Sequence, residues 1–192
     1  MVVVLAIGVR HAQCEAIRMR TYGRLNQLRL ALANYEHANG TLPTRQLMGA
    51  NGVPQFNWLV PVLPHLEHAD LLAALDLSKR WDDPHNLVVA QSDPIFFDFI
   101  TGDGYVVCPL DAHESIWNSE TALPIGKLSD SPDSIALIAI PMQSIEPFKP
   151  LTVTIEQLRA YANDGFRAFF IRSDGRYGNV ELLNGEVQFR LP

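Results

Sequence analysis

Two histidines with a glutamate between them form the sequence's first candidate for metal chemistry. His65 and His68 enclose Glu67, and Asp70 follows closely. A catalytic zinc site usually takes two histidines four residues apart on a helix, with a third ligand from elsewhere. Because these histidines are only three residues apart, we expect no metal at this position.

Four aspartates in a turn-rich region are the second candidate, because calcium binds several carboxylate and carbonyl oxygens at once. They are Asp93, Asp98, Asp103 and Asp111. No EF-hand spacing accompanies them, and aspartate is common in surface turns because its side chain bonds to nearby backbone. We therefore expect no cofactor, and bound calcium is the alternative.

Motifs for nucleophilic catalysis are missing from the sequence. There is no G-x-S-x-G elbow, and no motif ties a serine or cysteine to a histidine. Cys14 and Cys108 are too few for a disulfide framework, and we expect two free thiols that act as small apolar residues. The sequence predicts a protein that is not an enzyme.

A long amphipathic helix is the element against which the rest of the chain must pack. Its apolar residues recur at steps of three and four, which lines one helical face. They are Leu25, Leu28, Leu32 and Tyr35. Asn39-Gly40 and Pro43 supply stop signals, and no proline interrupts residues 2–39. We expect one helix of about 57 Å, weakened by Gly8 and Gly23.

The downstream residues predict a mixed body of short helices and strands. Asp83-Pro84 is an N-cap signal for a helix over 84–91, and another helix is expected from about Thr154. The apolar run 134–140 has the pattern of a central strand, and Asn184-Gly185 predicts a hairpin over 180–191. Residues 166–172 are also strand-like, and Tyr105–Cys108 is a candidate strand. We expect turns to dominate from Ser92 to Leu128.

Charge and hydropathy divide the chain into a basic N-terminal part and an acidic body. The net charge is −6, yet residues 1–40 hold five arginines against two glutamates. An acidic body argues against a nucleic-acid partner. The chain begins with an apolar run too short to span a bilayer, which takes about 20 residues. Such a run usually marks a membrane or protein contact, and here it consists of Val2, Val3, Val4, Leu5 and Ile7.

Several segments resemble a large bacterial family of pseudopilin-like proteins that carry a prepilin-type methylation segment. Val9–Arg18 (VRHAQCEAIR) and Leu25–Pro43 (LNQLRLALANYEHANGTLP) resemble the helix that follows the family's membrane segment. Asn57–Glu67 and Trp81–Asn86 resemble two further family blocks. Relatives close with a box of His, nine residues, then Asp-Gly. This chain keeps the spacing but has Asp174 and Asn184 there, so the role of the pair is open.

The resemblance implies a pilin-like α+β fold with a long N-terminal helix on an antiparallel sheet. It divides the chain into a helix, 1–40, and a body, 41–192, which form one domain together. It further implies a non-catalytic structural subunit of a type II secretion or type IV pilus-like assembly. Such a subunit contacts other pilin-like subunits through its helix and is anchored in the inner membrane, with its body outside the cytoplasm. The family's apolar run is longer, so Met1 is expected to lie inside it.

The alternative function is a cell-surface or periplasmic module that binds a solute or glycan. Its stacking platforms would be Trp58, Trp81 and Trp117. A deep pocket lined by two of these tryptophans would favour binding. A closed core with a projecting N-terminal helix would favour the assembly subunit.

Overall fold

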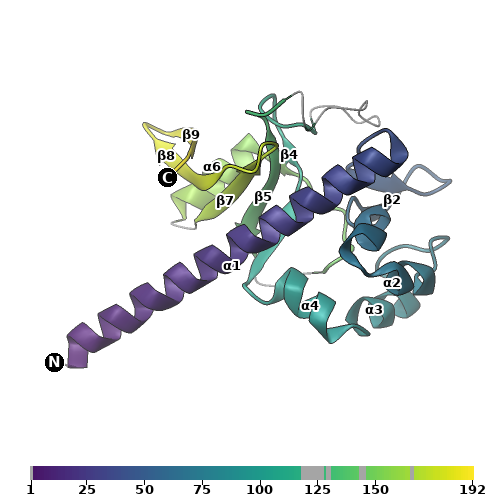
Figure 1. Cartoon of the computed structure of the whole chain (residues 1–192), viewed down its shortest axis with the longest axis horizontal. Coiled ribbons are helices and arrows are strands. Elements are labelled where there is room, and N and C mark those ends of the chain that lie inside the picture. The colour runs from purple at the N-terminus through teal and green to yellow at the C-terminus, as the bar shows by residue number, and fades with distance from the viewer. Residues whose placement is uncertain (1, 118–127, 129–130, 143–145, 165–166) are drawn as a thin grey trace.

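One helix, α1 (Val2–Asn39), runs the length of the molecule in the computed structural model. The structure describes residues 2–117, 128, 131–142, 146–164 and 167–192, and it describes side chains from residue 11 onward together with Val9. The helix ends where the sequence predicts, because Gly40 adopts a positive φ of 77° that a side chain would disfavour. Figure 1 shows α1 crossing the body and extending past it at the N-terminal end.

A five-stranded antiparallel sheet forms the centre of the body. Its strand order is β3-β5-β7-β8-β9. The strands are β3 (Tyr105–Cys108), β5 (Ile135–Pro141), β7 (Ala168–Arg172), β8 (Tyr177–Leu183) and β9 (Glu186–Arg190). Residues 135–140 of β5 are all buried, as expected for a central strand covered on both faces. The prediction of a strand over 134–140 is confirmed.

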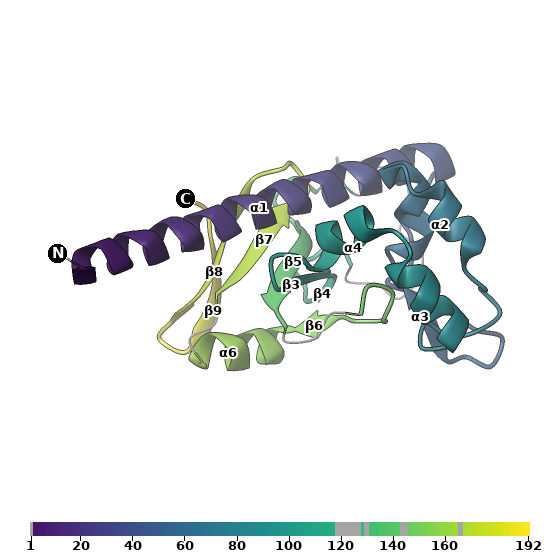
Figure 2. The same cartoon turned by 90° about the horizontal axis from the view of Figure 1, so that it is seen from below.

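Two helices cover opposite faces of this sheet, so the fold has three layers. α1 packs on one face, and α6 (Ile155–Asn163) packs on the other (Figure 2). Each face has its own hydrophobic cluster, one reaching from Leu25 to Ile171 and the other built around Cys108 and Phe170. A long N-terminal helix on an antiparallel sheet confirms the predicted α+β class and is consistent with a pilin-like architecture.

Short elements complete the body at the C-terminal end of α1. They are the hairpin β1 (Gln46–Met48) and β2 (Pro54–Asn57), the 3-10 helix η1 (Val60–Leu66), and the helices α2 (Ala69–Ala74), α3 (Pro84–Gln91) and α4 (Pro94–Thr101). Two further short strands, β4 (Leu110–Asp111) and β6 (Val153–Thr154), pair in parallel. The helix predicted over 84–91 is confirmed with the same bounds.

The expectation of turns from Ser92 onward is wrong for residues 94–101, which form α4. Asp93 caps this helix by accepting hydrogen bonds from the backbone N–H groups of Ile95 and Phe96, and Pro94 begins it. This is the same Asp-Pro signal that predicts α3. Residues 118–127 of the expected turn region lie outside the described part of the chain.

The hairpin expected over 180–191 is confirmed as β8 and β9. Asn184 and Gly185 join them, and both have positive φ, 55° and 81°. Such a two-residue turn matches the twist of the flanking strands. The strands pair from Leu183 opposite Glu186 to Asn179 opposite Arg190.

Candidate functional site

The helix α1 consists of two halves with different surroundings. Thr21, Tyr22 and the residues that follow contact the body, whereas the described side chains from Val9 to Arg20 are exposed or half-buried. The two half-buried ones, Glu15 and Arg18, pair with each other at 2.6 Å. Residues 2–20 rise by about 28 Å at 1.5 Å per residue, so the helix extends well beyond the sheet.

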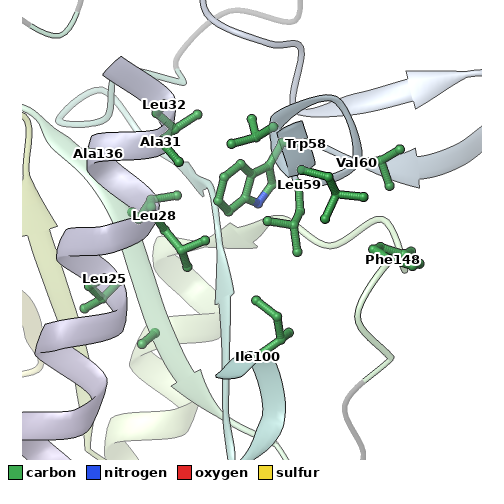
Figure 3. Close-up of a cluster of buried hydrophobic side chains, with 14 of the residues drawn as sticks. Leu25, Leu28, Ala31, Leu32, Trp58, Leu59, Val60, Ile100, Ala136 and Phe148 are labelled. Atoms are coloured by element: carbon green, nitrogen blue, oxygen red, sulfur yellow. The ribbon is translucent and has the colours of Figure 1, made fainter. Parts of the chain in front are cut away.

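The leucine face fixes the second half of α1 to the body. Leu25, Leu28 and Leu32 are at most 1% exposed, and Tyr35 is half-buried with its ring edge-to-face against His65. In Figure 3, Leu28 and Leu32 point from the helix toward the indole of Trp58. Burial of each leucine contributes about 1.5–3 kcal/mol.

A buried ion pair adds a polar connection between α1 and the turn after α4. The guanidinium of Arg24 lies 2.8 Å from Asp103 Oδ1, and the two side chains are 3% and 1% exposed. The Thr21 hydroxyl donates to Asp103 Oδ2 at 2.8 Å. Arg24 also donates to the carbonyl oxygens of Ile100 and Tyr105. One arginine thus binds the C-terminal end of α4, the turn and the start of β3.

The surroundings of Arg24 oppose and support its charge at the same time. Burial lowers the pKa of its guanidinium, while the adjacent Asp103 carboxylate raises it. The Nε of Arg24 has no hydrogen-bond partner among the described atoms. A buried pair of this kind is strongly destabilising when only one member is removed. Its geometry therefore defines where α1 sits along the body.

A third contact joins α1 to β8. The Tyr22 hydroxyl donates to Asn179 Oδ1 at 2.8 Å, and its ring lies 4.1 Å from that of Tyr177 and 5.3 Å from that of Phe169. Burial raises the pKa of the Tyr22 phenol to about 12. The leucine face, the Arg24–Asp103 ion pair and Tyr22 together hold residues 21–35 in one position against the sheet.

The histidine pair does not assemble a metal site. His68 Nδ1 lies 2.9 Å from Asp93 Oδ2, which also caps α4, whereas His65 faces Tyr35. Hydrogen bonds from the α4 backbone, first that of Phe96, lower the pKa of Asp93. In the described part of the chain, no three His, Cys, Asp or Glu side chains gather closely enough to hold a metal ion.

The four loop aspartates are dispersed, and each has a partner of its own. Asp93 caps α4, and Asp98 lies 3.6 Å from Arg20. Asp103 binds Arg24, and Asp111 lies 2.9 Å from Arg45. Each carboxylate therefore has a local structural role.

The tryptophans have unequal surroundings. Trp58 and Trp117 are each 1% exposed, and their rings lie 6.0 Å apart in the core. Trp81 is half-buried, with Lys149 Nζ 5.2 Å from its ring centre. The hollow beside Trp81 has a volume of about 60 Å³. This space is too small for a sugar ring, since small-molecule pockets typically exceed about 300 Å³.

The two altered box positions lie at opposite ends of β8. Asp174 precedes the strand and pairs with Arg176, which also contacts Asp133 at 2.6 Å. Asn184 follows the strand and forms the hairpin turn. A strand of seven residues separates them by about 23 Å, so they do not form one site.

The cysteines differ in exposure, and both are free. Cys14 is exposed on the projecting half of α1. Cys108 is buried in β3, and burial raises the pKa of its thiol well above the usual range. Only Cys14 is therefore accessible to reagents in the folded protein.

The apolar N-terminal residues belong to α1, but their side chains lie outside the described part of the structure. They are Val2, Val3, Val4, Leu5 and Ile7. Over the described residues, the search for a helix with the length and apolar character needed to span a bilayer finds none.

The sequence reasoning missed the polar residues that attach α1. Thr21 and Arg24 are three residues apart and thus on one helical face, beside the leucines. A charged residue next to an apolar face is usually solvated, so no local pattern predicts that Arg24 is buried. Asp103 is the partner of Arg24, whereas the sequence alone suggests Asp103 only as a calcium ligand.

Comparison with known proteins yields one family. A family model described as "Protein of unknown function (DUF1559)" matches residues 10–131, well over half of the chain. No curated protein and no solved structure matches the chain. The matched range includes both halves of α1 from residue 10, the α2–α4 region and β3, and it ends before the box at 174–187.

Proposed function

The chain belongs to this family of proteins of unknown function (DUF1559), and we propose that it is a non-catalytic, pseudopilin-like structural subunit of a type II secretion or type IV pilus-like assembly. The observation that carries this proposal is the division of α1. One half is fixed to the sheet by buried leucines and a buried ion pair. The other half is continuous with it, projects from the body and exposes apolar side chains, including Val9, Ile17 and Met19.

A projecting, partly apolar helix needs a partner, because exposed apolar surface of this kind marks contacts with protein or membrane. We assign two contacts to it. The apolar residues 2–7 enter the inner membrane, and the following turns contact neighbouring pilin-like subunits. The body then lies outside the cytoplasm. In this placement, the attachment of residues 21–35 to the sheet keeps the body in a fixed position relative to the subunits that contact the projecting half of α1.

The interior of the body supports a structural role over solute binding. Two of the three tryptophans that could stack on a ligand are packed in the core. Cys108 is likewise buried, His68 contacts Asp93, and Asp103 is paired with Arg24.

Fractionation of cells that express the protein from its own locus tests the proposal. We expect the protein in the inner-membrane fraction, with its body digested by protease added to spheroplasts. Deleting residues 2–8, which shortens the apolar run, should release it, whereas the change Ala12→Lys, farther along the exposed half, should not. A wild-type protein found entirely in the cytoplasm, or a deletion variant that stays in the membrane, contradicts the proposal.

A further inference from the structure

A second face of α1, opposite the leucine face, carries apolar and small residues and one asparagine at alternating steps of three and four. These residues are Val9, Ala12, Ala16, Met19, Gly23, Asn26, Leu30 and Ala33, and we call them the seam. All are exposed except Ala33, which is half-buried. Val9, Met19 and Leu30 are 51%, 57% and 46% exposed. The period of 3.5 residues is that of a helix that pairs with another helix.

Gly23 gives an independent indication of a helix partner. Glycine destabilises the interior of a helix relative to alanine, so its presence in the middle of α1 needs a reason. The body supplies none, because apart from the adjoining backbone of α1 itself no atom of the described residues lies within 4 Å of a Cβ built on Gly23. A second helix that approaches closely would supply it, since small residues let two helix backbones come together.

We propose that the seam binds a second copy of the same chain, with the two α1 helices parallel and in register. The proposal rests on the proposed function, which places both N-termini in one membrane, and it names the partner and the register. Charge supports this arrangement. Glu15 and Arg20 flank the seam five residues apart, the spacing at which flanking residues pair between parallel helices. Each Glu15 then faces Arg20 of the other copy.

The charged groups are free to make this exchange. Glu15 pairs with Arg18 of its own helix. Arg20 donates to the Gly102 carbonyl at 3.4 Å and lies 3.6 Å from Asp98, with the Arg20 and Asp98 side chains more than 60% exposed. Exposed pairs of this kind are weak, so re-pairing costs little.

The body leaves room for the second helix. The leucine face and the seam point in roughly opposite directions, and most of the body lies on one side of α1 in Figure 2. Beside Leu30, a groove of about 450 Å³ separates α1 from α4. Gln27 and Asn34 line it from α1, and Ile95, 81% exposed, lines it from α4. The flanking side chains of the partner helix fit into this groove, while the two bodies lie on opposite sides of the pair.

Disulfide trapping of the full chain in detergent micelles tests the register. In a Cys14→Ser background, Met19→Cys places a thiol in the seam, and Ile17→Cys places one on the same projecting half but outside it. Cys108 is buried and does not react. We expect most of the Met19→Cys protein to become a disulfide-linked dimer on a non-reducing gel. Ile17→Cys should give only traces of dimer.

Two further variants test the role of the seam residues. Gly23→Lys should leave the monomer folded, because the position faces open space, and should abolish the Met19→Cys dimer, because it places two like charges in the seam. Glu15→Arg should weaken dimerisation roughly fivefold, as expected for two exposed charge pairs, and adding Arg20→Glu should restore it. Circular dichroism of each variant checks the fold.

Two results would overturn the inference. They are equal cross-linking of Met19→Cys and Ile17→Cys, and a Gly23→Lys variant that is folded and still cross-links. The same variants in native membranes separate this inference from the proposed function. Cross-links from Met19→Cys only to a different protein overturn the homodimer and leave the assembly role intact. If neither position cross-links to any protein, the result contradicts both the homodimer and the assembly role.

Discussion

Arg24 and Asp103 form an ion pair at 2.8 Å that is almost completely buried, and it joins the N-terminal helix to the turn between α4 and β3. Asp103 accepts from Arg24, from the Thr21 hydroxyl and from the backbone N–H of Tyr105. Because the guanidinium also binds carbonyl groups at the end of α4, this pair is the polar counterpart of the leucine face.

Removal of one partner should strongly destabilise the protein. We expect Asp103→Ala to lower the free energy of unfolding by about 3–5 kcal/mol, because it leaves a buried, uncompensated guanidinium. The exposed pair Arg20–Asp98, at 3.6 Å, is the matched control, and Asp98→Ala should change stability by less than about 0.5 kcal/mol. Urea unfolding of both variants gives the comparison. Similar losses in both would show that burial of the pair is unimportant.

The leucine face of α1 predicts a sharp contrast between neighbouring positions. Leu28 is 1% exposed and Leu30 is 46% exposed. Leu28→Ala should cost about 2–5 kcal/mol through lost burial and a residual cavity. Leu30→Ala should be nearly neutral in dilute monomer, within about 0.5 kcal/mol. Chemical denaturation at low protein concentration measures both. A loss at Leu30 as large as that at Leu28 contradicts the assignment of the two faces.

Tyr22 predicts how stability depends on alkaline pH. Its pKa is raised from 10.0 to about 12, chiefly by burial, so the folded state favours the protonated phenol. The resulting stabilisation is fully present below pH 10 and is lost as pH rises toward 12. Unfolding midpoints between pH 8 and 12 should therefore fall less steeply for Tyr22→Phe than for the wild type. Parallel pH profiles of the two proteins would contradict this role.

The turn between β8 and β9 predicts which substitutions at Asn184 and Gly185 leave the stability of the protein unchanged. Asn184 and Gly185 both have positive φ, so Asn184→Asp should be nearly neutral because aspartate also adopts this conformation. Gly185→Val should cost about 1–2 kcal/mol, because a β-branched residue is strained there. Thermal unfolding distinguishes the variants. A neutral Gly185→Val would show that the turn is not as tight as described.

The regular elements were predictable because their signals are local. The periodicity of α1, the Asp-Pro cap of α3 and the Asn-Gly turn each act over a few residues, so the sequence identifies them directly. The same cap at Asp93-Pro94 begins α4, and it was outweighed by the many turn residues nearby. Strand order was out of reach, because pairing β5 with both β3 and β7 depends on distant contacts.

The attachment of α1 was predictable only in its apolar part. Leu25, Leu28 and Leu32 have a helical period, whereas Arg24 and Asp103 are 79 positions apart and share no pattern. An aspartate followed by glycine is normally a surface turn, and burial of its carboxylate depends on an arginine from another element. Such a pair is visible only in three dimensions. The role of the N-terminal apolar residues likewise stays a prediction.

The most direct test of the assembly role is a photo-cross-linking scan in the native cell envelope. A photoreactive amino acid is placed at Val9, Ile17 or Met19 on the projecting half of α1, and at the similarly exposed Leu77, Val88 or Leu183 on the body. We predict cross-links to pilin-like subunits, including other copies of this chain, from the α1 positions and few from the body. Cross-links confined to the body positions, with α1 unreactive toward any protein, would contradict the account.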